Sequence, residues 1–506
     1  MKTAYKTEFG DFQTPLPLAR EVCELLRRLG FSPDAVIEST CGLGVFLVAA
    51  SEVFPAAKLT GLEINGAYLD AARNSLEKAG ALSRTTLREQ DFFTHDWDAE
   101  IASVSGDLLI LGNPPWVTNS AVAALNGSNV PVKENFQGLR GMEARTGKSN
   151  FDISEWMLIR LVRSLCGRPA TIAVLCKSAT ARKFLRYSWQ NDGRIAEASI
   201  YRIDAKKHFN AAVDACLLLA RTGSSGPAEM AVYDSLDSRI PSVHAGLAGQ
   251  DLVADIKTYR RLQHLEGLCP YQWRSGVKHD CASVMELKTN PDGTLSNKLG
   301  EQVSLEPDFL YPLLKCTDLA NISPRPAKFV LMTQKRVGED TSPIATLAPR
   351  TWAYLNAHTS HFDSRKSSIY NEQVPFAIFG VGDYSFAPWK VAISGLHQKP
   401  RFVPVGPADG RPVQFDDTCY FLSFADEIEA LLVADILNSP CCLHFMQSLM
   451  FRDAKRPVTV ELLQRLNLGS IARDAGLADR WRRKPRVTYS SGEFIPQLEL
   501  LMETPD

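Results

Sequence analysis

Four consecutive residues offer the most specific chemistry in this chain: Asn113-Pro114-Pro115-Trp116, at the end of the strand-like run that begins at residue 107. Two prolines fix φ and have no N–H to donate, so they end a central strand and hold nearby carbonyls in one direction. The Asn113 side-chain oxygen and the Pro114 carbonyl oxygen can both accept hydrogen bonds from one exocyclic amino group of a base. Such acceptors stabilise the positive charge that develops as that nitrogen takes a methyl group. The Trp116 ring can stack on the base, which has to leave its duplex to arrive there.

Three acidic residues stand near the ends of three earlier strand-like runs: Glu38, Glu63 and Asp91. In a doubly wound sheet, ligands bind at the carboxyl ends of the strands. Glu63 can accept hydrogen bonds from ribose hydroxyls, and Asp91 can bind an adenine amino group whose ring packs on Phe92. Three carboxylates repel a diphosphate but suit a sulfonium, which favours S-adenosylmethionine over NAD. The alternative that Glu38 and Asp91 only cap turns or helices stays open.

The turn after the first strand reads Glu38-Ser39-Thr40-Cys41-Gly42-Leu43-Gly44. Its glycines allow the backbone to approach a ligand closely and to adopt conformations closed to other residues. The third glycine of the dinucleotide fingerprint is absent, because Leu47 stands in its place. An NAD oxidoreductase therefore has only one Gly-x-Gly in its favour.

Strand-like and helix-like segments alternate through the first 220 residues. Strands are predicted over 35–40, 58–64, 85–91, 107–113, 170–177, 196–203 and 214–220. This alternation indicates βαβ units and an α/β fold with a doubly wound, mostly parallel sheet. After the Gly- and Ser-rich segment 221–230 the pattern changes. A basic helix is predicted over 251–267, and a helix over 426–439 near the end. We therefore predict a catalytic domain over 1–235 and a second, α+β domain over 240–506.

Composition narrows the class of protein. The 506 residues carry a formal net charge of −1, which excludes a generally basic nucleic-acid coat protein but permits a local basic cleft. No apolar run reaches about 18 residues, and the start of the chain has no apolar signal region, so we expect a cytoplasmic protein without a membrane span. The 11 cysteines include no CxxC pair. Neither a metal site nor a disulfide framework is predicted.

With these motifs in order, the chain resembles the S-adenosylmethionine-dependent N6-adenine DNA methyltransferases. It is similar to the subgroup whose cofactor motifs precede the catalytic motif and whose target-recognition domain is C-terminal. The family tetrapeptide is Asn or Asp, then Pro-Pro, then Tyr, Phe or Trp, and it stands here as Asn113–Trp116. The resemblance covers about residues 9–220. The family usually has Val-Pro after its fifth strand, where this chain has Leu-Cys-Lys-Ser-Ala at 175–179.

The resemblance implies a class I methyltransferase sheet and a role for each matching residue. Thr14-Pro15 would cover the methionine part of the cofactor, and Glu38 would lie near its amino group. Glu63 would bind the ribose, and Asp91-Phe92 the adenine. Phe209, before the last antiparallel strand, would pack on the flipped base together with Trp116. The cofactor set also includes residues of the first turn: Cys41, Gly42 and Gly44.

The resemblance also implies the partners. The substrate would be double-stranded DNA in a restriction-modification or related defence system, with a restriction endonuclease on a separate chain as a further partner. The second domain would recognise the DNA sequence, because the first domain carries the cofactor and catalytic residues. Phosphate contacts set position and base contacts set specificity. Basic candidates for phosphate contacts are Lys335, Arg336, Arg365, Lys366, Lys390, Arg452, Lys455 and Arg456.

Other activities stay open on the sequence alone. The same acceptors serve the N4 amine of cytosine. Methylation of RNA or of a protein glutamine uses the same fold, although such relatives are generally shorter. A binding module with a disabled cofactor site is disfavoured by the intact Glu38, Glu63, Asp91 and Asn113. An acidic–x–Lys segment with Asp280, Glu286 and Lys288 is a poor match to a nuclease motif.

Overall fold

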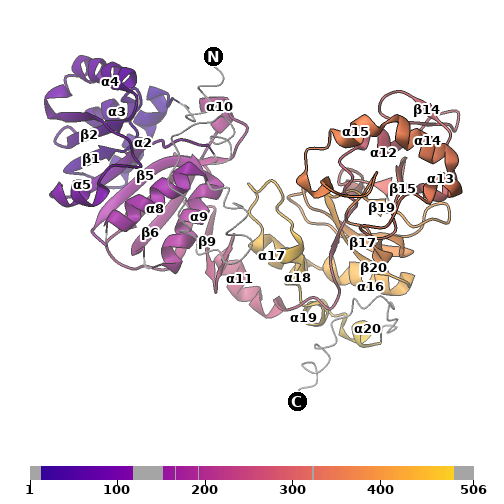
Figure 1. Cartoon of the computed structure of the whole chain (residues 1–506). Helices are drawn as coiled ribbons and strands as arrows, with labels where there is room; N and C mark the ends of the chain where they lie inside the picture. Colours follow the sequence, from indigo (N-terminus) through magenta and orange to yellow (C-terminus); the bar gives the residue numbers. More distant parts are fainter. Residues whose placement is uncertain (1–12, 118–151, 166, 192, 322–323, 484–506) are drawn as a thin grey trace. The chain divides into compact units, whose positions relative to one another are not determined.

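The computed structural model describes residues 13–117, 152–165, 167–191, 193–321 and 324–483. The chain divides into two compact units, Met1–Ile256 and Lys257–Asp506 (Figure 1). The boundary predicted at 235–240 is therefore too early. The reason is that β8, β9 and β10 continue the first sheet as far as Val253, since β8 pairs with β6 and β9 with β8. The predicted helix over 251–267 is replaced by β10 and the shorter α11.

The first unit is built on one ten-stranded sheet in the order β10-β9-β8-β6-β7-β5-β4-β1-β2-β3. The pairs β1–β2, β1–β4, β2–β3 and β4–β5 are parallel, and β7 is antiparallel to both β5 and β6. The strands are β1 (Ala35–Glu38), β2 (Lys58–Glu63), β3 (Thr85–Glu89), β4 (Leu108–Gly112), β5 (Ala170–Lys177), β6 (Ile195–Ile203), β7 (Ala215–Thr222), β8 (Glu229–Tyr233), β9 (Val243–Ala248) and β10 (Asp251–Val253).

Helices pack on this sheet in two groups, α2 with α3 and α3 with α4, and α5 with α8 and α8 with α9. This is the arrangement of a doubly wound α/β fold, so the predicted fold class is confirmed. The helices are α2 (Leu16–Arg28), α3 (Val45–Val53), α4 (Gly66–Lys78), α5 (Trp97–Ser103), α8 (Ile153–Leu165), α9 (Ser178–Gln190) and α10 (Ala205–Phe209).

The central strands owe their position to continuous apolar runs. All residues of β1 and β4 are buried, as expected for parallel strands covered on both faces. Because the runs end at Glu38 and Gly112, the polar residues that follow lie at the carboxyl edge of the sheet. The predicted strands in this region agree with the observed ones to within one or two residues.

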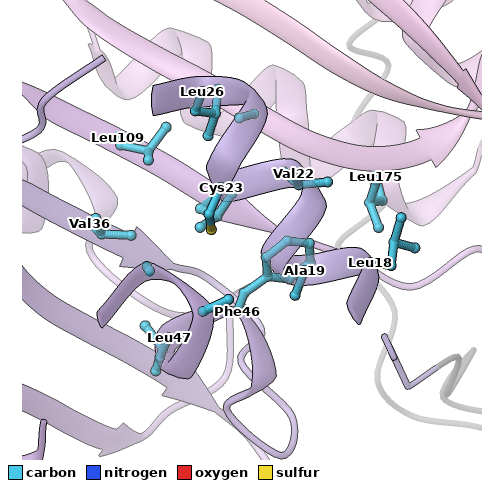
Figure 2. Close-up of a cluster of buried hydrophobic side chains, with 14 of the residues drawn as sticks. Leu18, Ala19, Val22, Cys23, Leu26, Val36, Phe46, Leu47, Leu109 and Leu175 are labelled. Atoms are coloured by element: carbon cyan, nitrogen blue, oxygen red, sulfur yellow. The ribbon is translucent and has the colours of Figure 1, made fainter. Parts of the chain in front are cut away.

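Helix α2 fixes the segment that precedes it. Its apolar residues recur at helical spacing, and Leu18, Val22 and Leu26 are fully buried. They share one cluster with Phe46 of α3 and with strand residues such as Leu109 (Figure 2). Burying a side chain of this kind contributes about 1.5–3 kcal/mol, so the start of α2 is firmly anchored to the sheet.

The second unit contains two sheets, ordered β11-β20-β17-β18 and β14-β13-β12-β16-β15-β19. The strands are β11 (Arg274–Ser275), β12 (Glu286–Thr289), β13 (Leu295–Ser296), β14 (Gln302–Val303), β15 (Leu310–Leu314), β16 (Lys328–Leu331), β17 (Trp389–Ser394), β18 (Val403–Val405), β19 (Gln414–Phe415) and β20 (Cys419–Phe424). The helices are α11 (Ile256–Leu262), which begins at the division, α12 (Ala282–Met285), α13 (Ile344–Leu347), α14 (Pro349–Ala357), α15 (Thr359–Asp363), α16 (Glu427–Leu437), α17 (Pro440–Leu449), α18 (Val460–Gln464), α19 (Leu468–Asp474) and α20 (Ala478–Arg482).

Within the described ranges, no single helix has both the length and the apolar character needed to cross a membrane. The consecutive helices α16 and α17 meet those criteria only as a pair, joined across a 61° bend.

Candidate active site

A pocket lies at the carboxyl edge of the first sheet, where the ends of β1, β2, β3 and β4 meet. It has about 1020 Å³ of empty space, which includes its open mouth. Of the predicted site residues, nine line it: Thr14, Glu38, Cys41, Gly42, Glu63, Asp91, Phe92, Asn113 and Pro115. The structure therefore brings Asn113 and Pro115 of the predicted catalytic turn into one pocket with seven of the predicted cofactor residues.

Glu63 ties the second strand to the first turn. Its Oε2 accepts a hydrogen bond from the Gly42 backbone N–H at 2.8 Å, and its Oε1 accepts one from Asn65 N–H at 2.9 Å. Gly42 has a positive φ of 51°, and a Cβ there would lie 3.3 Å from the Gln13 side chain. The turn conformation and the close approach of Gln13 both favour glycine at this position. The carboxylate is thus held in place at the edge of the pocket.

Glu38 is the most deeply buried acid of the pocket, at 3% exposure. Burial raises its pKa well above the ordinary value, and the charge of Glu63 adds to this effect. Within the described residues, its Oε2 has no hydrogen-bond partner. A buried carboxyl oxygen without a partner is costly, unless a ligand supplies a donor or a positive charge. The site therefore suits a cationic amino group.

Asp91 and Phe92 form the wall after β3. Asp91 Oδ1 accepts a hydrogen bond from Phe93 N–H at 2.9 Å, which fixes the carboxylate at the turn. Phe92 is 4% exposed, and its ring lies 4.7 Å from that of Trp97. The Trp97 indole N–H donates to the Phe92 carbonyl at 3.0 Å, so both side chain and backbone of Phe92 are held. This part of the pocket offers an acceptor beside an apolar ring.

Asn113 is delivered to the pocket by β4. Gly112 before it has φ 151°, and a Cβ at this glycine would lie 3.2 Å from Glu38 Cγ. Gly112, the residue before Asn113, therefore lies directly against the buried acid. The Asn113 side-chain Nδ2 donates to Thr14 Oγ1 at 3.2 Å. Asn113 thus lines the same pocket as the acids that end or follow the first three strands.

Trp116 and Phe209 do not line this pocket. Trp116 is 4% exposed, its indole N–H donates to the Leu175 carbonyl at 3.3 Å, and its ring meets that of Phe209 edge to face at 4.9 Å. Phe209 ends α10, before the antiparallel β7. The two predicted base-stacking rings are therefore in contact with each other. Their role toward a base stays a prediction.

Three further predicted residues, Pro15, Gly44 and Pro114, are not among the pocket lining. Gly44 has φ 75°, and a Cβ there would lie 2.8 Å from Ala72 Cβ on α4. Its glycine serves the close packing of α3 on α4. Burial raises the pKa of the Cys41 thiol, which disfavours the thiolate form.

Several lining residues were not singled out from the sequence. Gln13 precedes the Thr-Pro pair, and Tyr68 lies in the first turn of α4. Ile153 and Met157, one helical turn apart at the start of α8, close another side. Their i, i+4 spacing was readable, but it indicates only a buried helix face. Nothing in the sequence shows that α8 returns to this edge.

The acidic–x–Lys segment in the second unit forms a different arrangement. Glu286, 3% exposed, pairs through Oε2 with Lys298 at 2.8 Å and through Oε1 with Lys315. Lys288 is exposed on β12. In the parts of the chain that the structure describes, no group of three or more His, Cys, Asp or Glu side chains could hold a metal ion.

One predicted phosphate contact is wrong. Lys390 is 1% exposed, and its Nζ donates to the carbonyls of Ser385, Ala387 and Val413 at 2.9, 3.2 and 2.7 Å. Five of the six residues of β17 are buried, and backbone acceptors hold the Lys390 side chain among them. All the other candidates except Arg365 are exposed, and two of them, Arg336 and Arg456, form ion pairs with Asp383 and Asp417.

Comparison with known proteins supports the fold. No protein-family model matches the chain. A solved structure of the type IIL restriction-modification enzyme MmeI in complex with DNA superposes with a TM-score of 0.54 at 14% identity, over 99% of this chain and 73% of that one. The shared fold is that of the class I methyltransferases.

A relative in sequence then gives the family. The type II methyltransferase M.NspV of Nostoc sp. (strain ATCC 29411 / PCC 7524) is 44% identical over 474 residues, which are 92% of this chain and 98% of that protein. The type II methyltransferase M.XamI of Xanthomonas campestris pv. amaranthicola is 30% identical over 108 residues, 21% of this chain and 20% of that protein. The chain belongs to the type II methyltransferase family.

Proposed function

We propose that this chain transfers a methyl group from S-adenosylmethionine to the N6 amine of adenine in double-stranded DNA, as the modification enzyme of a restriction-modification or related defence system. The observation that carries the proposal is the placement of the Asn113 amide in one pocket with Glu38, Glu63 and Asp91. The restriction endonuclease would be a separate chain, and the reaction would take place in the cytoplasm.

The pocket residues fit S-adenosylmethionine. The Glu38 Oε2, which has no partner within the described residues, would accept a hydrogen bond from the amino group of the cofactor. The Glu63 carboxylate would accept hydrogen bonds from the ribose hydroxyls of the cofactor, and Asp91 would accept one from its adenine amine. The cofactor supplies an electrophilic methyl group on a sulfonium. Three acids at one edge disfavour the diphosphate of NAD, because like charges repel.

The catalytic turn would act on the amine of the base. The amine is a poor nucleophile, because its lone pair is delocalised into the ring. The Asn113 and Pro114 oxygens would accept its two N–H groups and so stabilise the positive charge that forms on the nitrogen. The target base would leave the duplex, at a cost of a few kcal/mol. Stacking on Trp116 or Phe209, about 1–3 kcal/mol per base, would offset that cost.

A basic face supports DNA as the substrate. β6 runs parallel to β5, so its end and α10 lie at the same edge as the pocket. Lys206 and Lys207 on α10 are exposed, and neither forms an ion pair within the described residues. Lysines placed near Phe209 suit the phosphates that flank a flipped nucleotide. Residues 257–506 would then supply the target-reading surface.

The test measures labelled methyl transfer to long duplex DNA made by amplification in vitro, which carries no methyl groups. The DNA is digested and the modified base identified by mass spectrometry. We expect the wild-type enzyme to form N6-methyladenine. The Asn113→Ala variant should form no methylated base but should still bind S-adenosylmethionine in equilibrium dialysis. N4-methylcytosine as the sole product would refute the base assignment, and label in RNA or protein instead of DNA would refute the substrate.

A further inference from the structure

The hydrogen bond between Asn113 and Thr14 joins the catalytic turn to the start of the chain, 99 residues away. We infer that Thr14 is a positioning residue, which determines which end of the Asn113 amide faces the base. The inference rests on the proposed function, because it matters only if Asn113 has to act as an acceptor. The resemblance gave Thr14 a cofactor role alone.

Thr14 is well placed to hold another side chain. It is only 9% exposed and directly precedes Pro15, whose carbonyl accepts from the Ala19 N–H at 3.1 Å in the first turn of α2. α2 in turn is anchored by its fully buried face (Figure 2). The Thr14 hydroxyl therefore has a fixed position relative to the sheet that carries Asn113.

The asparagine amide needs such a partner because its two ends are nearly equal in shape. Rotation about its terminal sp³–sp² torsion is broad and roughly two-fold, so the torsion itself selects neither orientation. With the oxygen toward the base, the amide accepts from the amine. With the nitrogen toward the base, it presents two N–H donors to an amine that also donates. Since Nδ2 donates to Thr14, the amide oxygen is turned away from Thr14.

The same hydroxyl connects this orientation to the pocket. Thr14 and Asn113 both line the pocket, and a hydroxyl has one proton as well as two lone pairs. A carboxylate in the pocket, such as that of the cofactor's methionine part, can only accept the hydroxyl proton. The Thr14 lone pairs are then left for Asn113 Nδ2. A filled pocket therefore favours the amide orientation that accepts from the base.

The experiment compares Thr14→Val, which keeps the shape but removes the hydroxyl, with Thr14→Ser, which keeps the hydroxyl. Methyl transfer to amplified duplex DNA is measured at saturating S-adenosylmethionine. Loss of one neutral hydrogen bond should lower kcat of T14V by about twofold to twelvefold, while T14S stays near wild type. An unchanged kcat in T14V, with only KM for the cofactor raised, would leave Thr14 a pure cofactor ligand and overturn the inference.

A double-mutant cycle with Asn113→Asp gives an independent readout. A carboxylate has two equivalent oxygens, so its orientation needs no selection. The effect of T14V on kcat should therefore largely disappear in the N113D background, whereas an equal effect in both backgrounds would contradict positioning. Thermal denaturation checks that each variant folds, and Thr14→Ala replaces T14V if the valine is not accommodated.

These outcomes separate the inference from the proposed function. If N113A keeps turnover, the proposed function is wrong. A different result refutes only the role of Thr14. In that case N113A is inactive, but T14V leaves kcat unchanged both in the wild-type background and in the N113D background.

Discussion

Glu38→Gln should change cofactor affinity and protein stability in opposite directions. Gln has nearly the shape of Glu but no charge. In the free protein, the Glu38 carboxyl is 3% exposed and burial raises its pKa, so its ionised form destabilises the fold. Removing the charge should therefore raise the melting temperature at pH 8. A residue whose role was only structural would lower it.

The loss of affinity follows from one acceptor position. Oε2 of Glu38 is the atom without a partner, so one charge-assisted hydrogen bond to the cofactor's amino group is at stake. Such bonds contribute about 1.5–3 kcal/mol, which corresponds to a Kd about 10- to 150-fold higher in E38Q. Titration calorimetry with S-adenosylmethionine measures it. Asp34→Asn, an acid outside the pocket, is the control for a general change in charge.

The affinity should also depend on pH. Because the pKa of Glu38 is raised in the free pocket, the carboxyl binds a proton that it has to release when a cationic amine binds. The ratio of wild-type to E38Q affinity should therefore increase as the pH rises through the raised pKa of Glu38, and then level off. A ratio that is constant from acid to alkaline pH, or an E38Q variant with wild-type affinity, would refute the assigned role.

Three further predictions concern other parts of the chain. Gly112→Ala should lower kcat more than about tenfold. A Cβ at this position, where φ is 151°, would lie 3.2 Å from Glu38 Cγ, and the backbone would have to move and displace Asn113. The control is Gly80→Ala, at a glycine that also has a positive φ but no neighbour within 4 Å, and it should leave kcat unchanged. Lys390→Met should lower the free energy of unfolding by about 3–5 kcal/mol in denaturant titrations, because three carbonyls lose their donor. Burial lowers the pKa of Lys390 to about 7, so above that pH the unfolded chain binds one proton more than the folded chain. The difference in the free energy of unfolding between wild type and K390M should therefore rise with pH from about 7 upward. A difference that falls with pH would contradict this. Replacing both Lys206 and Lys207 by Ala should reduce the slope of log DNA affinity against log salt by about 1.8, and an unchanged slope would remove α10 from the DNA contacts.

The sequence was sufficient to locate the ends of the strands that carry the site. Parallel strands buried on both faces appear as short apolar runs, and the polar residue after each run has to lie at the carboxyl edge. Glu38, Glu63, Asp91 and Asn113 could therefore be assigned to one pocket from the sequence alone. The order of these motifs also indicated the family.

Other features depend on contacts between segments that are far apart in the sequence. Local sequence patterns do not predict such contacts. Gly44 resembles a ligand-binding glycine in the sequence, but its closest neighbour is Ala72 on α4. Lys390 resembles a phosphate contact, but its strand turns it toward three carbonyls. Trp116 is buried against Phe209. The first sheet continues past residue 235 because β8 pairs with β6 and extends the sheet. The Thr14–Asn113 bond spans 99 residues, so only the packing of α2 against the sheet could place its two partners within hydrogen-bonding distance.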